Sequence, residues 1–197
     1  MTESLKDEVL MSQYREGDSS SFAVLYGRHK GPSFRYFLRQ GVGSDASQEL
    51  FQDVWASVIK AAPTYKASAR FTTWLYRIAH NRLVDHWRAK QKRDAVEGSD
   101  IIPLGAGDPD MNNEPVNADQ TDQRTPEREL QAREQWQQFA TAFEQIPVEQ
   151  KTAFILKQEA GLSVEEIAEI TGVSRETAKS RLRYAHGKLK AAIGGDQ

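Results

Sequence analysis

The residues best suited to chemistry lie near the end of the chain, at the spacing of one exposed helix face. They carry charge or can form hydrogen bonds: Glu176, Lys179, Ser180 and Arg183. At 100° per residue these four share one side of a helix. The other side carries Ala178, Leu182, Ala185 and Leu189. A helix that buries one side and presents such a polar side has the form of a recognition helix in the DNA major groove. Taken alone, the basic residues also fit a solvated surface helix.

The residues that precede this face favour DNA over the solvated helix. Ser163 followed by Glu166 is the pattern of a capping box, which begins a helix. Ala168 is small where two helices must cross closely, and Gly172 permits the positive φ of a tight turn. Ser174 is then a suitable cap for a second helix. Together these signals predict a helix-turn-helix.

The distribution of charge supports a nucleic-acid partner, although the 197-residue chain has a formal net charge of −2. Residues 95–126 carry a net charge of −6, which leaves +4 on the rest. Within that rest, residues 70–93 hold seven basic residues against Asp85 alone, and residues 175–190 hold six against Glu176 alone. Two basic helices therefore flank an acidic segment, an asymmetry that the average conceals.

Composition also restricts the cellular compartment of the protein and the kinds of functional site that it can hold. The chain has no cysteine, so disulfides and thiolate metal sites are excluded and a reducing compartment is indicated. The first residues have neither a basic nor an apolar leader region, and no apolar run could span a membrane. We expect a cytoplasmic protein without membrane insertion. His80 and His86 are six residues apart, which is unlike a zinc pair on one helix face, and paired carboxylates are missing. An enzyme, a metal, a cofactor and a small-molecule substrate are therefore not expected.

Helical spacing dominates almost the whole chain and predicts an all-α fold of two small domains. Helices are expected at 5–16, 19–40 with Asp18 as cap, 45–61 and 71–92. The Gly31-Pro32 pair is expected to kink or split the second helix. Residues 95–126 are rich in Gly, Pro, Asp and Asn, which predicts a flexible linker. Helices at 127–146 and 149–160 then lead into the helix-turn-helix.

The helix expected at 71–88 combines aromatic and basic residues. One arc should be core and consists of Phe71, Trp74, Leu75, Ile78 and Ala79. A largely opposite arc carries Thr73, Arg77, Asn81, Val84 and Arg88, and beside it lie Tyr76, His80, Leu83 and Trp87. Aromatic rings beside basic and amide groups suit single-stranded or distorted DNA, because bases stack on the rings. The alternative is an amphipathic helix with interfacial aromatics. Arg82 projects onto the apolar arc, so we expect it to snorkel or to pair with an acid.

The order of these segments resembles a known family. Residues 71–85 resemble the region 2.3 to 2.4 helix of bacterial extracytoplasmic-function (ECF) sigma factors of the sigma-70 family, residues 45–55 resemble their region 2.2, and residues 161–190 resemble region 4.2. Residues 17–22 match the usual opening of the family. The resemblance implies a sigma region 2 domain at 1–94, the acidic linker at 95–126 and a sigma region 4 domain at 127–192. It also implies a non-enzymatic subunit that joins core RNA polymerase, reads the −10 and −35 promoter elements, and has an anti-sigma factor as partner.

The same resemblance implies roles for particular residues. The polymerase surface would include Glu49, Gln52 and Asp53 on the β′ clamp coiled coil, with the β flap as a second polymerase contact. The loop at 62–70 would capture a flipped base, and −10 contacts would come from Tyr65, Lys66, Arg77, His80 and Asn81. Contacts with the −35 element would come from Arg175, Glu176, Lys179, Ser180 and Arg183.

Three alternatives stay open at this point. The apolar residues Leu50, Phe51, Val54, Trp55, Val58 and Ile59 either exceed one core-facing stripe or are all core. The acidic linker either mimics RNA in a polymerase channel or is only a tether. An autonomous DNA-binding regulator, with the N-terminal half as a dimerisation or signal domain, is the alternative function. The helix at 71–88 favours the sigma factor, because a repressor has no use for a second nucleic-acid surface.

Overall fold

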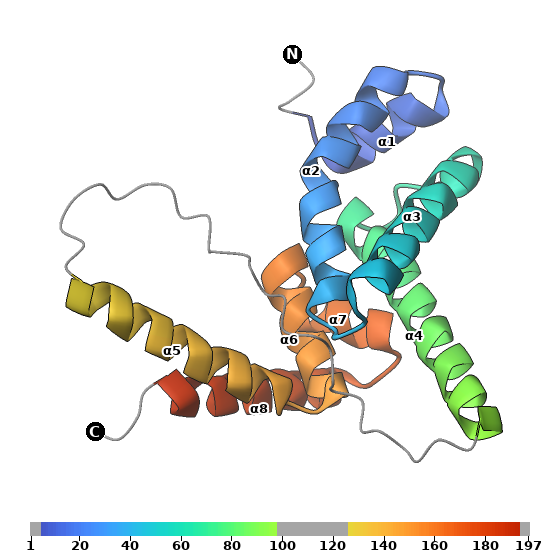
Figure 1. Ribbon diagram of the computed structural model, residues 1–197. Helices are drawn as coiled ribbons and strands as arrows, with labels where there is room; N and C mark the ends of the chain where they lie inside the picture. The colour runs from blue at the N-terminus through green and yellow to red at the C-terminus, as the bar shows by residue number, and fades with distance from the viewer. Residues whose placement is uncertain (1–4, 98–125, 194–197) are drawn as a thin grey trace.

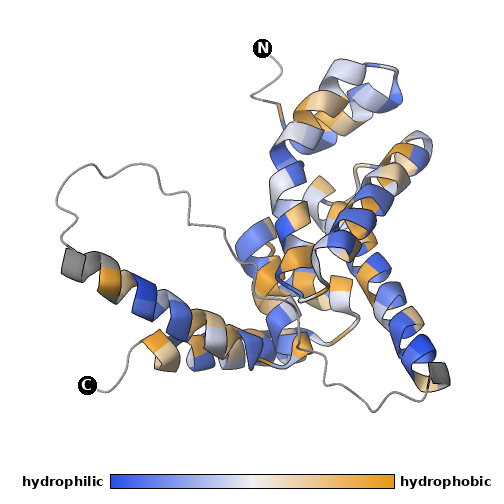
Figure 2. Ribbon diagram, viewed as in Figure 1, coloured by the Kyte–Doolittle hydropathy of each residue, from blue (hydrophilic) through white to orange (hydrophobic). Residues whose placement is uncertain are grey.

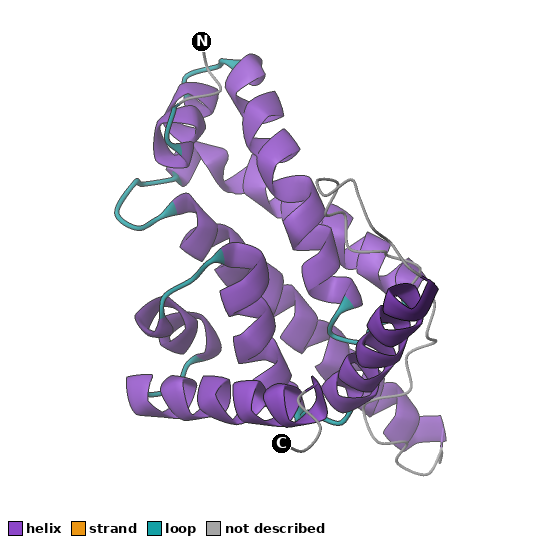
Figure 3. Cartoon of the chain, turned by 90° about the vertical axis from the view of Figure 1, so that its left-hand side faces the viewer, coloured by secondary structure: helices purple, strands orange, loops and turns teal. Residues whose placement is uncertain are grey.

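The computed structural model describes residues 5–97 and 126–193, and every regular element in these ranges is helical (Figure 3). The expected all-α fold class is therefore confirmed. The elements in chain order are α1 (Asp7–Arg15), α2 (Ser19–Leu38), α3 (Ser44–Ala61), the 3₁₀ helix η2 (Ala62–Thr64), α4 (Phe71–Glu97), α5 (Pro126–Glu144), α6 (Val148–Ala160), α7 (Val164–Thr171) and α8 (Arg175–Ile193). The linker expected at 95–126 lies outside the described residues except at its two ends, which are helical.

Local sequence signals account for several helix ends. Asp18 caps α2, because its Oδ1 accepts a hydrogen bond from the Ser20 amide at 2.9 Å. Gly161, with φ 61°, ends α6 in the left-handed conformation. The expected split of the second helix is wrong, since α2 runs through Pro32 without interruption. A proline removes only one backbone hydrogen bond, and the fully buried Leu25 and Tyr36 on either side hold the helix in place.

Helices α1 to α4 form an N-terminal module around an aromatic core. Tyr26 meets Trp55 edge-on at 4.9 Å between ring centroids, and Tyr36 meets Tyr76 in the same way at 5.5 Å. Such edge-to-face pairs add to the stabilisation from burial of the rings. Figure 2 shows that hydrophilic residues dominate the end of α4 that projects away from this core. The module thus presents a polar, basic arm beside a packed body.

Helices α5 to α8 form a C-terminal module. Helices α5 and α8 lie side by side and project away from the N-terminal module, while α6 and α7 lie against α2 and α4 (Figure 1). Its core includes Phe143, Ile155, Leu156 and Leu182. The position of α6 and α7 brings the helix-turn-helix next to the aromatic-rich helix α4.

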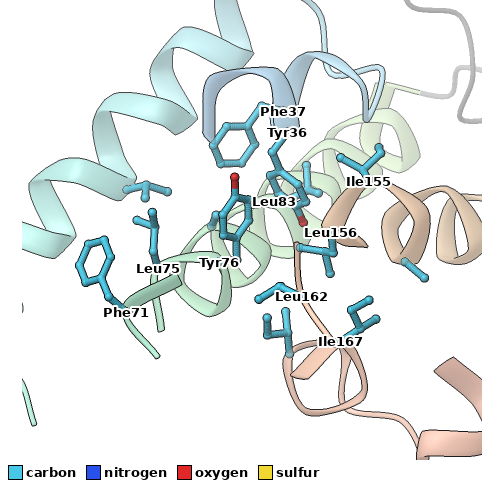
Figure 4. Packing of buried hydrophobic residues seen from close by; sticks show 14 of the residues in the cluster. Tyr36, Phe37, Phe71, Leu75, Tyr76, Leu83, Ile155, Leu156, Leu162 and Ile167 are labelled. Carbon is cyan, nitrogen blue, oxygen red and sulfur yellow. The ribbon is translucent and has the colours of Figure 1, made fainter. Parts of the chain in front are cut away.

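The two modules share one continuous core. Figure 4 shows Tyr36 and Tyr76 of the N-terminal module beside Leu156 and Leu162 of the C-terminal module, and all four side chains are buried. The chain is therefore folded in a closed arrangement, in which α7 lies against α4.

Candidate nucleic-acid interface

The helix-turn-helix is built as the sequence predicts. The Glu166 amide donates to Ser163 Oγ at 3.2 Å, and the Ser163 amide donates to Glu166 Oε2 at 2.8 Å, which completes the capping box. Gly172 adopts φ 67° at the turn, a left-handed conformation that glycine takes without strain. The Thr177 amide then donates to Ser174 Oγ at 3.1 Å at the start of α8. These local bonds fix the angle at which α8 leaves the turn.

Helix α8 presents the expected polar face. Its packing side is buried and consists of Ala178, Leu182, Ala185 and Leu189. On the other side Glu176, Lys179 and Arg183 are exposed, and Ser180 is half-buried. Hydrogen-bonding groups at i, i+3, i+4 and i+7 can reach successive base edges and phosphates of a major groove. This face is the best candidate for duplex DNA in the chain.

Arg175 differs from its neighbours because it is held by carboxylates. Its guanidinium pairs with Glu165 of α7 and, at 3.3 Å, with Glu176. The hydrogen bond from Arg175 holds the pKa of Glu165 below its usual value. All three side chains are largely exposed, so the pairs are weak and leave Arg175 able to exchange a carboxylate for a phosphate.

The residues expected at the −10 element are not all accessible. Lys66 and Asn81 are exposed. Tyr65 is only 4% exposed, and its ring packs edge-on against Trp74 at 5.1 Å between centroids. Burial raises the pKa of Tyr65 to about 12. The ring of Tyr65 therefore belongs to the core and has no free face on which a base could stack in this arrangement.

His80 lies at the junction of the two modules. Its Nδ1 is 3.3 Å from the hydroxyl of Tyr36, and the ring is half-buried. Burial, together with the nearby guanidinium of Arg181, lowers the pKa of His80. The lowered pKa favours the neutral form of the imidazole, which lies near Arg181 of the C-terminal module.

The expected exposed aromatic stripe on α4 is wrong. Tyr76 and Leu83 are fully buried, and the Thr73 side chain is 2% exposed although it was placed on the polar arc. Helical periodicity places these residues away from the core only if α4 packs on one side. In the structure α2 and α3 cover one side and α6 and α7 cover part of the other, so the core arc is wider. The interfacial alternative describes this helix better.

Carboxylates of the C-terminal module occupy the basic face of the N-terminal module. Arg77 pairs with Glu169 of α7. Thr73 Oγ1 donates to Glu166 Oε1 at 2.5 Å, and Arg70 lies 3.5 Å from the same carboxylate. These acidic residues take the positions at which DNA phosphates would be expected to lie. The first helix of the helix-turn-helix therefore covers the part of the predicted −10 surface around Arg77, while Lys66 and Asn81 stay exposed.

A second group of contacts lies deeper in the same junction. Glu159 of α6 has a side chain that is only 5% exposed, and it pairs with Arg35 at 2.9 Å and with Arg39. The Thr152 hydroxyl donates to Gln40 Oε1 at 3.1 Å. A carboxylate between two guanidinium groups forms charge-assisted hydrogen bonds, which are stronger than bonds between neutral groups.

Comparison with known proteins decides the family. Residues 25–93 match Sigma-70 region 2, and residues 136–189 match Sigma-70, region 4. The chain is 31% identical over 197 residues to the ECF RNA polymerase sigma-E factor of Haemophilus influenzae, with 98% of each chain covered. The chain belongs to the extracytoplasmic-function sigma factors of the sigma-70 family. It is also 28% identical over 190 residues to the sigma-E factor of Escherichia coli K12, with 92% of this chain and 91% of the relative covered.

Two solved structures have a similar fold. The sigma factor RpoE of Bartonella quintana, in complex with the anti-sigma factor NepR, has a TM-score of 0.67 at 19% identity, and 89% of this chain and 98% of that chain are covered. CnrH, in complex with the cytosolic domain of CnrY, has a TM-score of 0.62 at 20% identity, with 97% and 99% covered. As a sigma factor, this chain binds core RNA polymerase and promoter DNA and directs promoter-specific initiation of transcription.

The sigma factor's α3 carries the residues expected at the polymerase surface. Glu49, Gln52 and Asp53 are all exposed on one side of this helix. Most of the apolar residues beside them are core, because Leu50, Val54, Trp55 and Val58 are buried and Phe51 is half-buried. Only Ile59, 47% exposed, is available as additional apolar surface among these six. Burial in one core is therefore the correct alternative for nearly all of them.

The acidic residues of the junction were not predicted from the sequence, and the environment predicted for the basic residue Arg82 is wrong. Glu159, Glu166 and Glu169 gave no signal as partners, because their arginines lie more than 90 residues away in the chain. Arg82 does not snorkel into the core, and within residues 5–97 and 126–193 it pairs with no acid; it is exposed and donates to Ser57 Oγ at 3.1 Å. The sequence does hold one indication of these ion pairs, because the first turn of α7, where the capping box lies, carries the acidic residues Glu165 and Glu166.

Within residues 5–97 and 126–193, no group of three or more His, Cys, Asp or Glu side chains is placed to hold a metal ion. In the same ranges no helix is both long enough and apolar enough to cross a lipid bilayer.

Proposed function

We propose that this sigma factor reads a promoter with two separate surfaces, which act together only when polymerase holds them. The region 2 domain would comprise residues 1–94 and the region 4 domain residues 127–192, joined by the segment between them. The observation that carries this proposal is the polar face of α8, which follows a capped turn and lies opposite a buried side. A protein of this kind performs no chemistry itself, and it works in the cytoplasm beside RNA polymerase.

The α8 face reads the −35 element in the major groove. Lys179 and Arg183 donate to guanine acceptors, and Glu176 accepts from cytosine. Ser180 and Arg175 hold phosphates, which position the helix but carry no sequence information. Arg175 reaches a phosphate after it leaves Glu165, and the exposed geometry of that pair makes the exchange inexpensive.

The N-terminal end of α4 and the preceding loop read the −10 element. Lys66 and Asn81 are exposed and free to contact the unwound strand. Arg77 joins them once Glu169 is displaced, and His80 becomes accessible when the modules separate. Tyr65 contributes by shaping the loop from within the core rather than by touching a base. Such contacts must compensate for the free energy of unstacking a base, which is a few kcal/mol.

The polymerase surface of region 2 is the exposed side of α3. Glu49, Gln52 and Asp53 meet the clamp coiled coil of the β′ subunit, while region 4 meets the β flap. Binding at two distant sites pulls the modules apart, since one rigid closed body cannot span both. Polymerase thus uncovers the −10 surface that α7 covers in the closed arrangement.

An anti-sigma factor is the expected regulatory partner. The two similar structures are complexes of sigma factors with anti-sigma proteins. A partner that binds both modules at once would hold this chain closed, because the carboxylates of α6 and α7 already occupy the basic face of region 2.

The test is run-off transcription on a library of genomic fragments with purified core polymerase. We expect transcripts from defined start sites only when the sigma factor is present. The proposal fails if added protein starts no transcript while it protects a specific duplex site alone, since that result identifies an autonomous regulator.

A further inference from the structure

Helix α4 begins without a capping side chain from its own segment. The Trp74 amide donates to the Arg70 carbonyl at 3.1 Å, so the first turn starts at Arg70. An arginine side chain has no acceptor, and the first amides of a helix need one. The acceptor comes from another helix, because the Phe71 amide donates to Glu8 Oε1 of α1 at 2.7 Å. A carboxylate at this end also interacts favourably with the helix dipole.

Helix α1 also holds the beginning of the loop at 66–70, which leads into α4. Arg15 Nη1 donates to the Tyr65 carbonyl at 3.2 Å. Glu8 and Arg15 are seven residues apart and so lie on one face of α1. Between their two attachment points, Tyr65 and Phe71, all five residues of the loop at 66–70 are exposed. Helix α1 therefore clamps both ends of an otherwise solvent-facing loop.

Helix α1 is itself a fixed reference point. Leu10 and Met11 are completely buried in the core of the N-terminal module. Asp7 Oδ2 lies 2.7 Å from His29 Nε2, which ties the start of α1 to α2. Because α1 is anchored in the core, its hydrogen bonds to the two ends of the loop restrict the positions that the loop can adopt.

A hollow lies between the clamp and the loop. It has a volume of about 730 Å³, and its wall includes Lys6, which precedes α1, and Glu8 of α1, together with Ser68, Arg70 and Thr72. The hollow is open to solvent, and the polar groups on its wall can form hydrogen bonds with an edge of a base.

We infer that Glu8 and Arg15 are positioning residues of the −10 reader: by clamping the loop at 66–70 from α1, they determine how a flipped base is received in the hollow. The inference rests on the proposed function, which assigns base capture to this loop. Neither residue is required to touch DNA. Their effect is on the discrimination between bases at one position, not on the strength of promoter binding as a whole.

The first measurement examines the clamp without any DNA. Amide hydrogen exchange at Phe71 is followed by NMR in the full chain, for Glu8→Ala, Glu8→Gln and the control Asp94→Ala, which removes a carboxylate from the exposed end of α4. We expect exchange about five-fold faster in Glu8→Ala, the effect of losing a helix cap. Glu8→Gln keeps an acceptor oxygen and should restore slow exchange, and the control should match the native chain. Unchanged exchange in Glu8→Ala would overturn the clamp.

The second measurement examines its role in reading. Core polymerase with each variant transcribes a promoter from the fragment library and its single-base variants at −10 and −35. Glu8→Ala and Arg15→Ala should lose discrimination at one −10 position by about five-fold, with −35 discrimination and polymerase affinity unchanged. An equal loss on every template would show a merely structural residue and overturn the inference. If the native chain starts no transcript, the proposed function fails, whereas the exchange result still decides the clamp.

Discussion

Arg77 on α4 forms an ion pair with Glu169 on α7, across 92 residues of sequence and between the two modules. One partner belongs to the predicted −10 surface and the other to the first helix of the −35 reader. Both side chains are substantially exposed, at 42% and 56%, so water screens the pair and it can be broken readily. A DNA phosphate can therefore replace this one of the contacts between the two modules of the free sigma factor.

The buried carboxylate of Glu159 should contribute most to closure. Glu159→Gln weakens two charge-assisted bonds in a low-dielectric site, with an expected cost of about 2 kcal/mol to the closed arrangement. Glu169→Ala should cost less than about 1 kcal/mol, because its pair is exposed. The chain has no cysteine, so Ala56→Cys and Ala132→Cys on the exposed faces of α3 and α5 accept two dyes for energy transfer.

Energy transfer should therefore decrease in the order native, Glu169→Ala, Glu159→Gln. Glu134→Gln changes an exposed carboxylate of α5 and provides the control, with no expected change. Equal transfer in all four proteins would show that these acids do not hold the modules together.

Acid should open the chain through His80. Its pKa is lower in the closed arrangement than the ordinary value of 6.5, because burial and Arg181 disfavour the imidazolium. Opening therefore takes up a proton, so closure is fully stable above about pH 6.5 and loses stability as the pH falls below it. Energy transfer between the same dyes should decrease between about pH 7.5 and pH 5.5. In His80→Gln the decrease should be absent; a decrease of the same size would assign the effect to another group.

Lys179 and Arg183 should each contribute to recognition of the −35 element. Replacement of either by alanine should weaken promoter use by about 1–3 kcal/mol if the side chain reads a base, and should relax specificity at one base pair. Lys188→Ala removes the same charge from a different side of α8 and should have a small, sequence-independent effect. Run-off transcription on −35 variants measures the loss of promoter use and the change in specificity. Equal losses on all templates would show that Lys179 and Arg183 contact phosphates and not bases.

Tyr65 should behave as a core residue. Its hydroxyl is buried and has no hydrogen-bond partner among the described residues. Tyr65→Phe should leave the free energy of unfolding unchanged or raise it by up to about 1 kcal/mol, because an unsatisfied polar group is removed. Tyr65→Ala should lower it by about 3–5 kcal/mol. Urea denaturation gives both values. Reduced promoter use by Tyr65→Phe at full stability would instead place the hydroxyl on DNA.

Local signals in the sequence were sufficient for the helix-turn-helix. The capping box of Ser163 and Glu166, the left-handed Gly172 and the buried side of α8 each depend on residues a few positions apart. The same local logic failed for α4, because its faces are decided by helices from the other module. Tyr76 lies on a flank of the helix wheel yet is fully buried, since α2 and the C-terminal module both cover it.

The positioning residues were harder to foresee for the same reason. Glu8 has no helix-capping pattern in its own segment, and the amide that it accepts from lies 63 residues further along the chain. Its role depends on how α1 packs against α4, which periodicity does not specify. The exposed Asn81 and Lys66, by contrast, follow from their place on a helix face and in a loop.

The two readers should act together only on polymerase, and a comparison of DNA protection with transcription distinguishes this behaviour from that of an autonomous regulator. A promoter found in the fragment library is mixed with the free chain, with core polymerase alone, and with both, and DNA protection and run-off transcripts are measured side by side. We predict weak binding without sequence preference for the free chain, and protection of both elements with a defined start site for the mixture. Tight, sequence-specific protection by the free chain, with no transcript gained on adding polymerase, would show instead that the chain reads DNA without polymerase.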